Sequence, residues 1–257
     1  MKIVVVGGTG LIGSKLVTKL QQAGEAVVAA SPSHGIDAYT GDRLVEALRG
    51  ADVVVDVSNT KHVEGEAARE FFTRSTTNLL DAGATAGVGH HITLSIVGAD
   101  RAPEDGYFVA KKAQEQLVLA SPLPHSLLRA TQFFEFAEQI ADWNTTEGTI
   151  RLPATSMKPV ASDDVVQSLF DLVETEPTGN ILELGGPEEI GLDEFVRRVL
   201  LLHHDDRYIF TDRGAEPKGF NLRSVALLPH DGALVASTTL DVWIEQRRAK
   251  ERLAQRS

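Results

Sequence analysis

The sequence has no cysteine among its 257 residues. This absence excludes disulfides, thiolate metal sites and thiol nucleophiles, although it does not identify the compartment. Positive charge is scarce as well, since 25 lysines and arginines stand against 36 aspartates and glutamates and leave a net charge of −11. A nucleic-acid-binding protein needs a basic surface, so this charge argues against nucleic acid as a partner.

Long apolar runs are also missing. The longest ones are far shorter than the roughly 20 residues of a membrane-spanning helix, so no membrane partner is expected. The apolar run near the N-terminus is too short for a signal peptide and leads directly into glycines, which predicts a cytoplasmic protein. The length suits one large α/β core, with or without a small appendage.

The most informative stretch is the glycine-rich turn near the start of the chain. The β-branched run Lys2–Val6 is followed by glycines at every third position and then by a helical pattern. This order predicts a buried strand, a turn and a helix N-terminus that binds a pyrophosphate. We expect Gly7 to permit the turn, Gly10 to let phosphates approach, and Gly13 to let helix and strand pack closely. A glycine turn that binds nothing is the alternative. The predicted cofactor-binding residues here are Gly7, Thr9, Gly10, Leu11, Ile12 and Gly13.

The second apolar run, Ala26–Ala30, lacks an acidic residue at its end. An acid at this place would accept hydrogen bonds from the adenosine ribose of NAD. Ser31 and Ser33 stand there instead and could donate to the 2′-phosphate of NADP, so NADP is predicted, with NAD possible because no arginine lies beside them. Ordinary turn chemistry explains the serines equally well. Asp42 opens the next helix, either as its N-cap or as an acid near the adenine.

Alternating strands and helices continue along the first half of the chain. A buried strand over 52–57 ends in Ser58 and Asn59, which are expected to face the cofactor crevice. The pattern predicts a doubly wound, Rossmann-type parallel α/β sheet. We assign 1–131 to an NAD(P)-binding domain. Residues 132–257 form a small, mostly helical substrate-binding portion, some segments of which return to the core. The stretch after His203 shows no clear strand.

A tyrosine and a lysine stand four residues apart at the start of a predicted helix. Tyr107 and Lys111 would share one face of that helix. A phenol has a pKa near 10, and a neighbouring ammonium lowers it toward the range of a general acid or base. Lys111 could also hold the nicotinamide ribose. Ser95, or Thr93 on the same side of its strand, could polarise a substrate carbonyl. A partly buried tyrosine beside a solvated lysine is the alternative interpretation.

These motifs together resemble the short-chain dehydrogenase/reductase superfamily, and within it the atypical, NmrA-like branch of NAD(P)-binding proteins. The resemblance rests on the glycine turn, on Tyr107 with Lys111, and on the segments 52–56, 94–98, 127–131 and 240–244. It implies an oxidoreductase with the catalytic residues Ser95, Tyr107 and Lys111, and favours a homo-oligomer. Some members of this branch bind the cofactor as sensors without turning over a substrate.

The substrate side and the histidines are less informative. Gln132, Phe133 and Phe136 are candidates for lining a substrate pocket, although ordinary core packing is at least as good an explanation. Adjacent histidines such as His90 and His91 point to opposite faces of a strand, so no metal site is expected from them. The histidine and aspartate run at 203–206 fits a helix end and a turn.

The predicted function is therefore an NAD(P)-dependent oxidoreductase, preferring NADPH, that acts on a small carbonyl or alcohol compound with Tyr107 as general acid or base. One alternative is a non-catalytic dinucleotide-sensing regulator. The other is a sugar-nucleotide epimerase or dehydratase, against which the missing acid after Ala30 argues.

Overall fold

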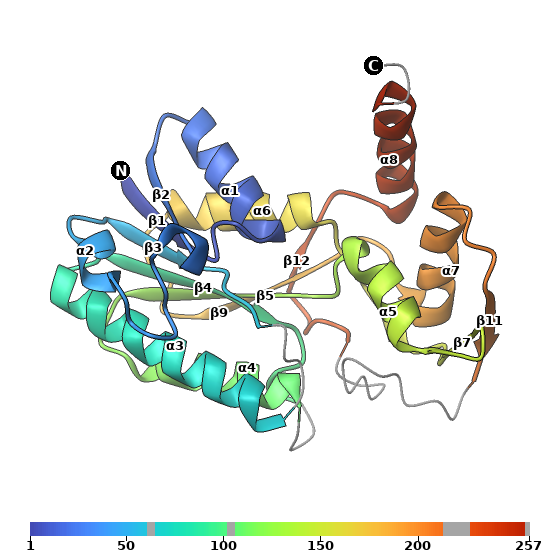
Figure 1. Cartoon of the computed structure of the whole chain (residues 1–257), viewed down its shortest axis with the longest axis horizontal. Helices are drawn as coiled ribbons and strands as arrows, with labels where there is room; N and C mark the ends of the chain where they lie inside the picture. The colour runs from blue at the N-terminus through green and yellow to red at the C-terminus, as the bar shows by residue number, and fades with distance from the viewer. Residues whose placement is uncertain (61–64, 102–105, 213–226, 255–257) are drawn as a thin grey trace.

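The computed structural model describes residues 1–60, 65–101, 106–212 and 227–254. Within these residues the centre of the molecule is a seven-stranded sheet in the order β12-β9-β5-β4-β3-β1-β2 (Figure 1). Every neighbouring pair of its strands is parallel, which confirms the predicted Rossmann-type sheet. The strands are β1 (Lys2–Val6), β2 (Ala26–Ala30), β3 (Val53–Asp56), β4 (His90–Ile96), β5 (His125–Ala130), β9 (Ile181–Gly185) and β12 (Leu234–Val235).

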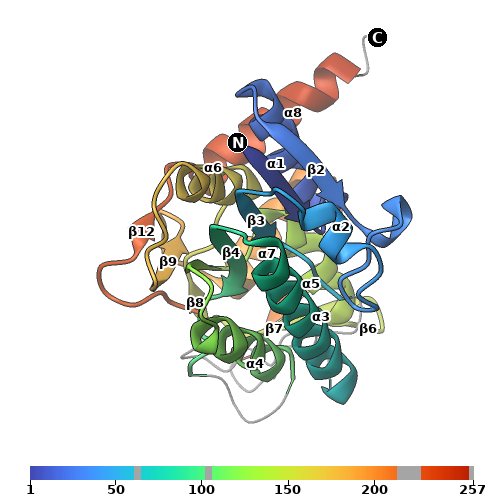
Figure 2. The ribbon, with the colours of Figure 1, turned by 90° about the vertical axis from the view of Figure 1, so that its left-hand side faces the viewer.

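Helices cover both faces of this sheet. Helices α1 and α6 pack together on one face, and α3 and α4 run side by side on the other (Figures 1 and 2). None of the helices among the described residues is long and apolar enough to cross a membrane. The helices are α1 (Leu11–Gln22), α2 (Leu44–Leu48), α3 (Gly65–Ala86), α4 (Tyr107–Ala120), α5 (Ala137–Trp143), α6 (Ser162–Val173), α7 (Leu192–Leu202) and α8 (Leu240–Ala254), with short 3-10 turns η1 (Pro32–His34) and η2 (Phe134–Phe136).

The continuous apolar run of β1 follows from burial on both faces of the sheet. Ile3 and Val5 belong to the core cluster that contains Leu16 of α1. Val4 and Val6 belong to the opposite cluster, with Leu79 of α3. Because successive side chains of a strand point to opposite faces, both sets have to be apolar, which is the pattern typical of a buried parallel strand.

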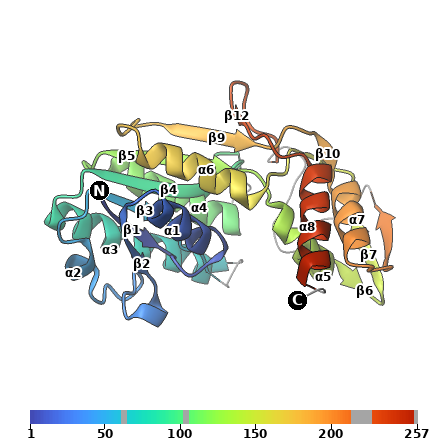
Figure 3. The same cartoon turned by 90° about the horizontal axis from the view of Figure 1, so that it is seen from above.

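After β5 the chain builds a smaller lobe at one end of the sheet (Figure 3). Phe134, Phe195 and Trp243 pack together in its core, with ring centroids 6.1 and 5.5 Å from Phe134. Helices α5, α7 and α8 form the lobe together with short strands, whereas α6, β9 and β12 return to the main sheet. The short strands are β6 (Thr145–Thr146), β7 (Thr149–Leu152), β8 (Ser156–Met157), β10 (Ile190–Gly191) and β11 (Tyr208–Thr211).

Two predictions about elements need correction. The segment after His203, predicted without strands, contains β11 and β12, whose formation depends on the parallel partners β7 and β9. Asp42 does not cap α2, because Arg43 precedes the helix in a left-handed conformation with φ 56° and no side-chain cap is present. The sequence also predicts a long helix over about 64–84, which is α3, and its expected first residue, Glu64, lies outside the described residues.

Candidate functional site

A cleft of about 910 Å³ opens at the carboxyl ends of the central strands. Its wall is made by the residues that follow β1, β2 and β3 and by the last residues of β4 and β5, which is where ligands bind in open parallel sheets. The neighbours of β1 are β2 on one side and β3 on the other, so the strand order reverses beside the glycine turn. The cleft therefore occupies the topological switch point of the sheet.

The glycine turn forms one end of this cleft and fits a dinucleotide. Gly7 has φ +79°, and a Cβ on Gly13 would lie 2.1 Å from the carbonyl oxygen of Gly7, so Gly13 is required for packing rather than for lining the cleft. Helix α1 begins at Leu11 without a side-chain cap. The first N–H groups of a helix have no intrahelical acceptor, and here no side chain caps them, an arrangement that suits an anion. The predicted turn residues that line the cleft are Gly7, Thr9, Gly10, Leu11 and Ile12.

The residues predicted to bind the cofactor after β2 differ in their positions relative to the cleft. Ser31 is buried and lines the cleft, whereas Ser33 is exposed and reaches the site only through a 2.8 Å hydrogen bond with the Ser31 hydroxyl. Asp42 is exposed and contributes nothing to the cleft wall. The acid in the wall is Asp37, whose carboxylate accepts a hydrogen bond from the backbone N–H of Tyr39 at 2.8 Å. Asp37 was missed because no helix start or strand end marks it in the sequence.

An arginine from the start of α2 also approaches this turn. A Cβ built on Gly35 would lie 3.5 Å from Nη1 of Arg43, so the guanidinium lies against the turn that contains Ser33. Arg43 is exposed, and its only charged neighbour in the described chain is Glu46, with an Nη2–Oε1 distance of 3.0 Å. No arginine stands directly beside Ser31 and Ser33 in the sequence, but the fold places Arg43 next to their turn.

Tyr107 contributes a buried phenol to the cleft wall. It is 9% exposed, and its hydroxyl donates a hydrogen bond to Oδ1 of Asn59 at 3.1 Å. Burial raises the pKa of Tyr107 above its ordinary value of 10, and the Asn59 hydrogen bond opposes this shift. The expected lowering of the phenol pKa by Lys111 is absent in this structure, because desolvation is the largest effect on the group. Tyr107 is therefore protonated at neutral pH.

Lys111 lies one helical turn further along α4 and is 3% exposed. Its ammonium donates to the carbonyl oxygen of Leu94 at 2.9 Å and to the side-chain oxygen of Gln114, and lies 4.4 Å from the ring centroid of Phe72. Burial lowers the pKa of Lys111 to about 8, against the charges of Asp56 and Glu115. The ammonium is thus held by acceptors at the end of β4 and is not the solvated lysine of the alternative interpretation.

Ser58 and Asn59 follow β3 and line the same wall. The backbone N–H of Ser58 donates to the carboxylate of Asp56 at 2.9 Å, which fixes the turn after the strand. The Ser58 hydroxyl oxygen is buried and has no hydrogen-bond partner among the described residues. An unpaired buried hydroxyl at the cleft wall fits a site that receives a polar ligand.

Ser95 lies in the cleft wall, but its hydroxyl has another partner. It donates to Oε1 of Glu115 at 2.6 Å, and both residues are buried. Glu115 in turn receives two hydrogen bonds from Arg129, at 2.8 and 2.7 Å. Residue 96, which points to the opposite face of β4, is an isoleucine that shares a core cluster with Tyr107. In this structure the Ser95 proton is directed to Glu115, which argues against the expected donation to a substrate carbonyl. Thr93 is fully buried and outside the cleft wall.

The opposite wall of the cleft comes from the smaller lobe. The predicted residues Gln132, Phe133 and Phe136 all line it. Gln139 and Trp143 line it too. They were not predicted, although they follow Phe136 at three and seven residues and so continue the same helical face. Phe134 instead points into the core of the lobe.

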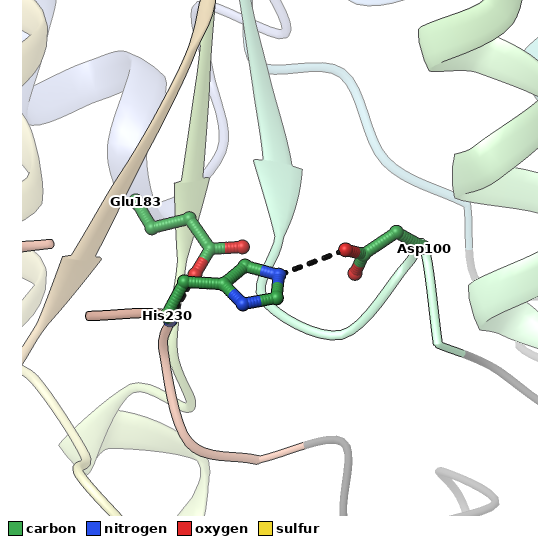
Figure 4. A group of neighbouring side chains, drawn as sticks. All are labelled: Asp100, Glu183 and His230. Atoms are coloured by element: carbon green, nitrogen blue, oxygen red, sulfur yellow. Dashed lines mark hydrogen bonds and ion pairs between the residues drawn. The ribbon is translucent and has the colours of Figure 1, made fainter. Parts of the chain in front are cut away.

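A second polar cluster lies outside the cleft wall. Asp100, Glu183 and His230 present ligand atoms within 4.8 Å of one another, and Nε2 of His230 lies 2.9 Å from the Asp100 carboxylate (Figure 4). Arg129 also contacts this group, 3.1 Å from Glu183 and 3.3 Å from Asp100. Burial opposes ionisation of Asp100, yet His230 and Arg129 lower its pKa to about 2. The Arg129 guanidinium, which also pairs with Glu115, already contacts both carboxylates, so the cluster is a set of ion pairs.

The family of the chain can now be stated. Residues 7–176 match the model of the NAD(P)H-binding family, so the chain belongs to that family. The match covers the glycine turn, Tyr107 and Lys111. With the Rossmann-type sheet, it confirms the resemblance to atypical short-chain dehydrogenases/reductases.

Particular relatives fall into two groups. The photosystem II assembly factor Ycf39 of Synechocystis sp. is 25% identical over 172 residues, which cover 58% of this chain and 53% of that protein. The chain thus spans about half the length of this curated relative.

The structural relatives cover the whole chain. The dTDP-4-dehydrorhamnose reductase of Bacillus anthracis, solved with NADP, has a TM-score of 0.75 and 14% identity, with 97% of this chain and 99% of that chain covered. A short-chain dehydrogenase/reductase superfamily protein of Agrobacterium tumefaciens, solved with NAD, has a TM-score of 0.69 and 18% identity, with 100% and 99% covered. At these identities the similarity defines the fold.

Proposed function

We propose that this protein is an NADPH-dependent reductase of a small carbonyl compound, with Tyr107 as the proton donor. The observation that carries the proposal is the position of a protonated phenol and a buried ammonium in one wall of a dinucleotide-sized cleft. Family membership supports the cofactor class, and the unpaired Ser58 hydroxyl with the uncapped start of α1 supports a polar, anionic guest.

The residues around the turn would hold the cofactor. The N–H groups of Leu11 and Ile12 would bind the pyrophosphate, and Asp37 would accept a hydrogen bond from the adenine amine in the place first expected for Asp42. Ser31 and Arg43 would bind the 2′-phosphate of NADP, since a guanidinium suits phosphate better than any other side chain. Bound NADPH would supply the hydride.

The chain supplies the proton and its electrostatic setting. Tyr107 would protonate the carbonyl oxygen as its carbon is reduced, and the phenolate left behind would regain a proton from solvent. Lys111 would hold the nicotinamide ribose, because its ammonium is already fixed at the end of β4. Ser95 would take no direct part, since its proton is held by Glu115.

The test is the substitution Tyr107→Phe. We expect it to leave the affinity for NADPH within about twofold and to lower turnover by at least about 100-fold, in the range of general acid catalysis. NADPH binding would be measured by calorimetry and turnover by loss of NADPH absorbance with a panel of carbonyl compounds. An unchanged turnover rate would contradict the role of Tyr107.

A second candidate function is a dinucleotide-sensing regulator that binds a protein partner. The match to the assembly factor Ycf39 favours it. In that case wild type and the Tyr107→Phe variant would bind NADPH equally, and neither would turn over any carbonyl compound. A sugar-nucleotide epimerase or dehydratase would instead retain NAD tightly through a cycle. Release of the oxidised cofactor after each turnover would argue against it.

A further inference from the structure

Gln132 places an unpaired hydrogen-bond donor in the wall of the cleft. The residue is 3% exposed, and its Nε2 has no partner among the described residues. Its backbone is fixed, because the carbonyl of Gln132 accepts from Val160 at 2.8 Å and the N–H of Phe134 donates to Val160 at 2.9 Å. A buried donor without an acceptor destabilises a fold, so its retention at a cleft wall points to an acceptor on a ligand.

The surface around Gln132 is aromatic. The rings of Phe133 and Phe136 stack with centroids 5.4 Å apart and an angle of 18°, and both side chains are partly exposed. Trp143 continues this wall two turns further along. The unused faces of such rings favour a planar, apolar guest, since offset stacking adds to the burial of apolar surface.

The described residues in the cleft wall formed by the smaller lobe carry no charge. The single cation in the described wall is Lys111, which is held by Leu94 and Gln114 at the end of β4, and the single acid is Asp37 beside the turn after β2. The ligands of diphosphates are normally arginines, lysines or helix N-termini. The wall formed by Gln132, Phe133, Phe136 and Trp143 supplies none of these.

Relying on the proposed function, we propose that the substrate is an uncharged, planar aromatic carbonyl compound rather than a sugar nucleotide. Its ring packs on Phe133 and Phe136, and its carbonyl oxygen, which has two lone pairs, accepts a hydrogen bond from Gln132 on one of them. In the reaction the carbonyl carbon gains the hydride of NADPH and the oxygen gains the proton of Tyr107. The products are an alcohol and NADP⁺, and solvent returns the proton to Tyr107.

The first test is binding of three probes to the protein saturated with NADP⁺, where no turnover takes place. Calorimetry would compare acetylnaphthalene, its carboxylated analogue acetylnaphthoate, and dTDP. We expect acetylnaphthalene to bind at least about tenfold more tightly than acetylnaphthoate, because burial of an unpaired carboxylate is costly. We expect dTDP not to compete. Tighter binding of either anion, or no binding of acetylnaphthalene, would overturn the proposal.

The second test compares Gln132→Leu with Gln139→Leu. Gln139 is the matched control, because it is an exposed amide on the same wall. Loss of one hydrogen bond should weaken acetylnaphthalene about tenfold in Gln132→Leu and less than about twofold in the control. Gln132→Leu should also melt at the same or a higher temperature, since an unpaired donor is removed. Unchanged affinity in Gln132→Leu would refute the assigned contact.

The two proposals fail separately. The binding measurements involve no hydride transfer, so they would stand if Tyr107→Phe retained turnover and the proposed chemistry were wrong. Conversely, full catalytic dependence on Tyr107 with preferential binding of acetylnaphthoate or dTDP would retain the chemistry and overturn the substrate class.

Discussion

The hydroxyl of Tyr107 donates to Oδ1 of Asn59 at 3.1 Å, which joins α4 to the turn after β3 within one wall of the cleft. The two residues are 48 positions apart in the sequence. Under the proposed mechanism this hydrogen bond orients the phenol before the substrate arrives. We expect Asn59→Ala to lower the single-turnover rate of NADPH oxidation about tenfold at saturating NADPH, the equivalent of one hydrogen bond. Asn59→Asp serves as a control with the acceptor retained. A rate unchanged in Asn59→Ala would show that Tyr107 is oriented without it.

The pH dependence of activity should follow Lys111. Its pKa of about 8 means that the ammonium is present at neutral pH and is lost as pH rises through 8. Because kcat/KM reports the free enzyme, we expect kcat/KM for NADPH to fall above about pH 8. The profile would be measured from pH 6 to 10, in roughly half-unit steps. In Lys111→Met the fall should disappear together with most of the activity.

Stability should change in the opposite direction over the same range. The pKa of Lys111 is lower in the folded chain than its ordinary 10.5, so between about pH 8 and 10.5 the unfolded chain binds more protons. The contribution of Lys111 to the free energy of unfolding therefore rises with pH in that window, by on the order of 3 kcal/mol. Urea unfolding of wild type and Lys111→Met would isolate this contribution. A parallel pH dependence of the two proteins would contradict the assigned pKa.

Ser95→Ala should affect stability more than turnover. The substitution removes the hydrogen bond to Glu115, which keeps its two bonds from Arg129, so we expect a loss of about 1 kcal/mol in the free energy of unfolding. Turnover should change less than about threefold, because the Ser95 proton is not directed at the substrate. Removing a true oxyanion donor costs about 100-fold or more, and such a loss would restore the role that the sequence suggested. Thr93→Val on the same strand face provides the comparison.

Arg43→Gln should separate the two nicotinamide cofactors. If Arg43 binds the 2′-phosphate, KM for NADPH should rise about tenfold and KM for NADH should change less than about twofold. Arg49→Gln is the control, since Arg49 is another exposed arginine at the opposite end of α2. Equal effects of Arg43→Gln on both cofactors would assign that arginine to the surface ion pair with Glu46 alone.

The elements that could be predicted are those with a strong local pattern. Strands β1 and β3 are buried on both faces and therefore read as apolar runs, and the glycine turn is defined by its own sterics. Strands β11 and β12 were not predicted, because segments of four and two residues have no periodicity and exist only through pairing with β7 and β9. Asp37 was missed in favour of Asp42 because no helix start or strand end marks Asp37 in the sequence.

The cleft wall formed by the smaller lobe was predicted only in part. The prediction covered Gln132, Phe133 and Phe136, which stand close together in the sequence. The helical spacing that extends this group to Gln139 and Trp143 was also present in the sequence. The sequence did not show which of the three neighbouring phenylalanines packs in the core. Phe134 packs against Phe195 and Trp243, both more than fifty residues away in the chain.

The sequence by itself determined the sheet, the glycine turn and the cofactor class, because strand burial and glycine sterics depend on near neighbours in the chain. Only the tertiary structure decided which polar groups face the cleft. It turned the Ser95 proton toward Glu115, placed Tyr107 against Asn59 and brought Arg43 to the turn after β2. It also left Nε2 of Gln132 without a partner in the described part of the chain. Hydrogen bonds and burial between distant segments set these orientations, and they carry the chemistry proposed for this protein.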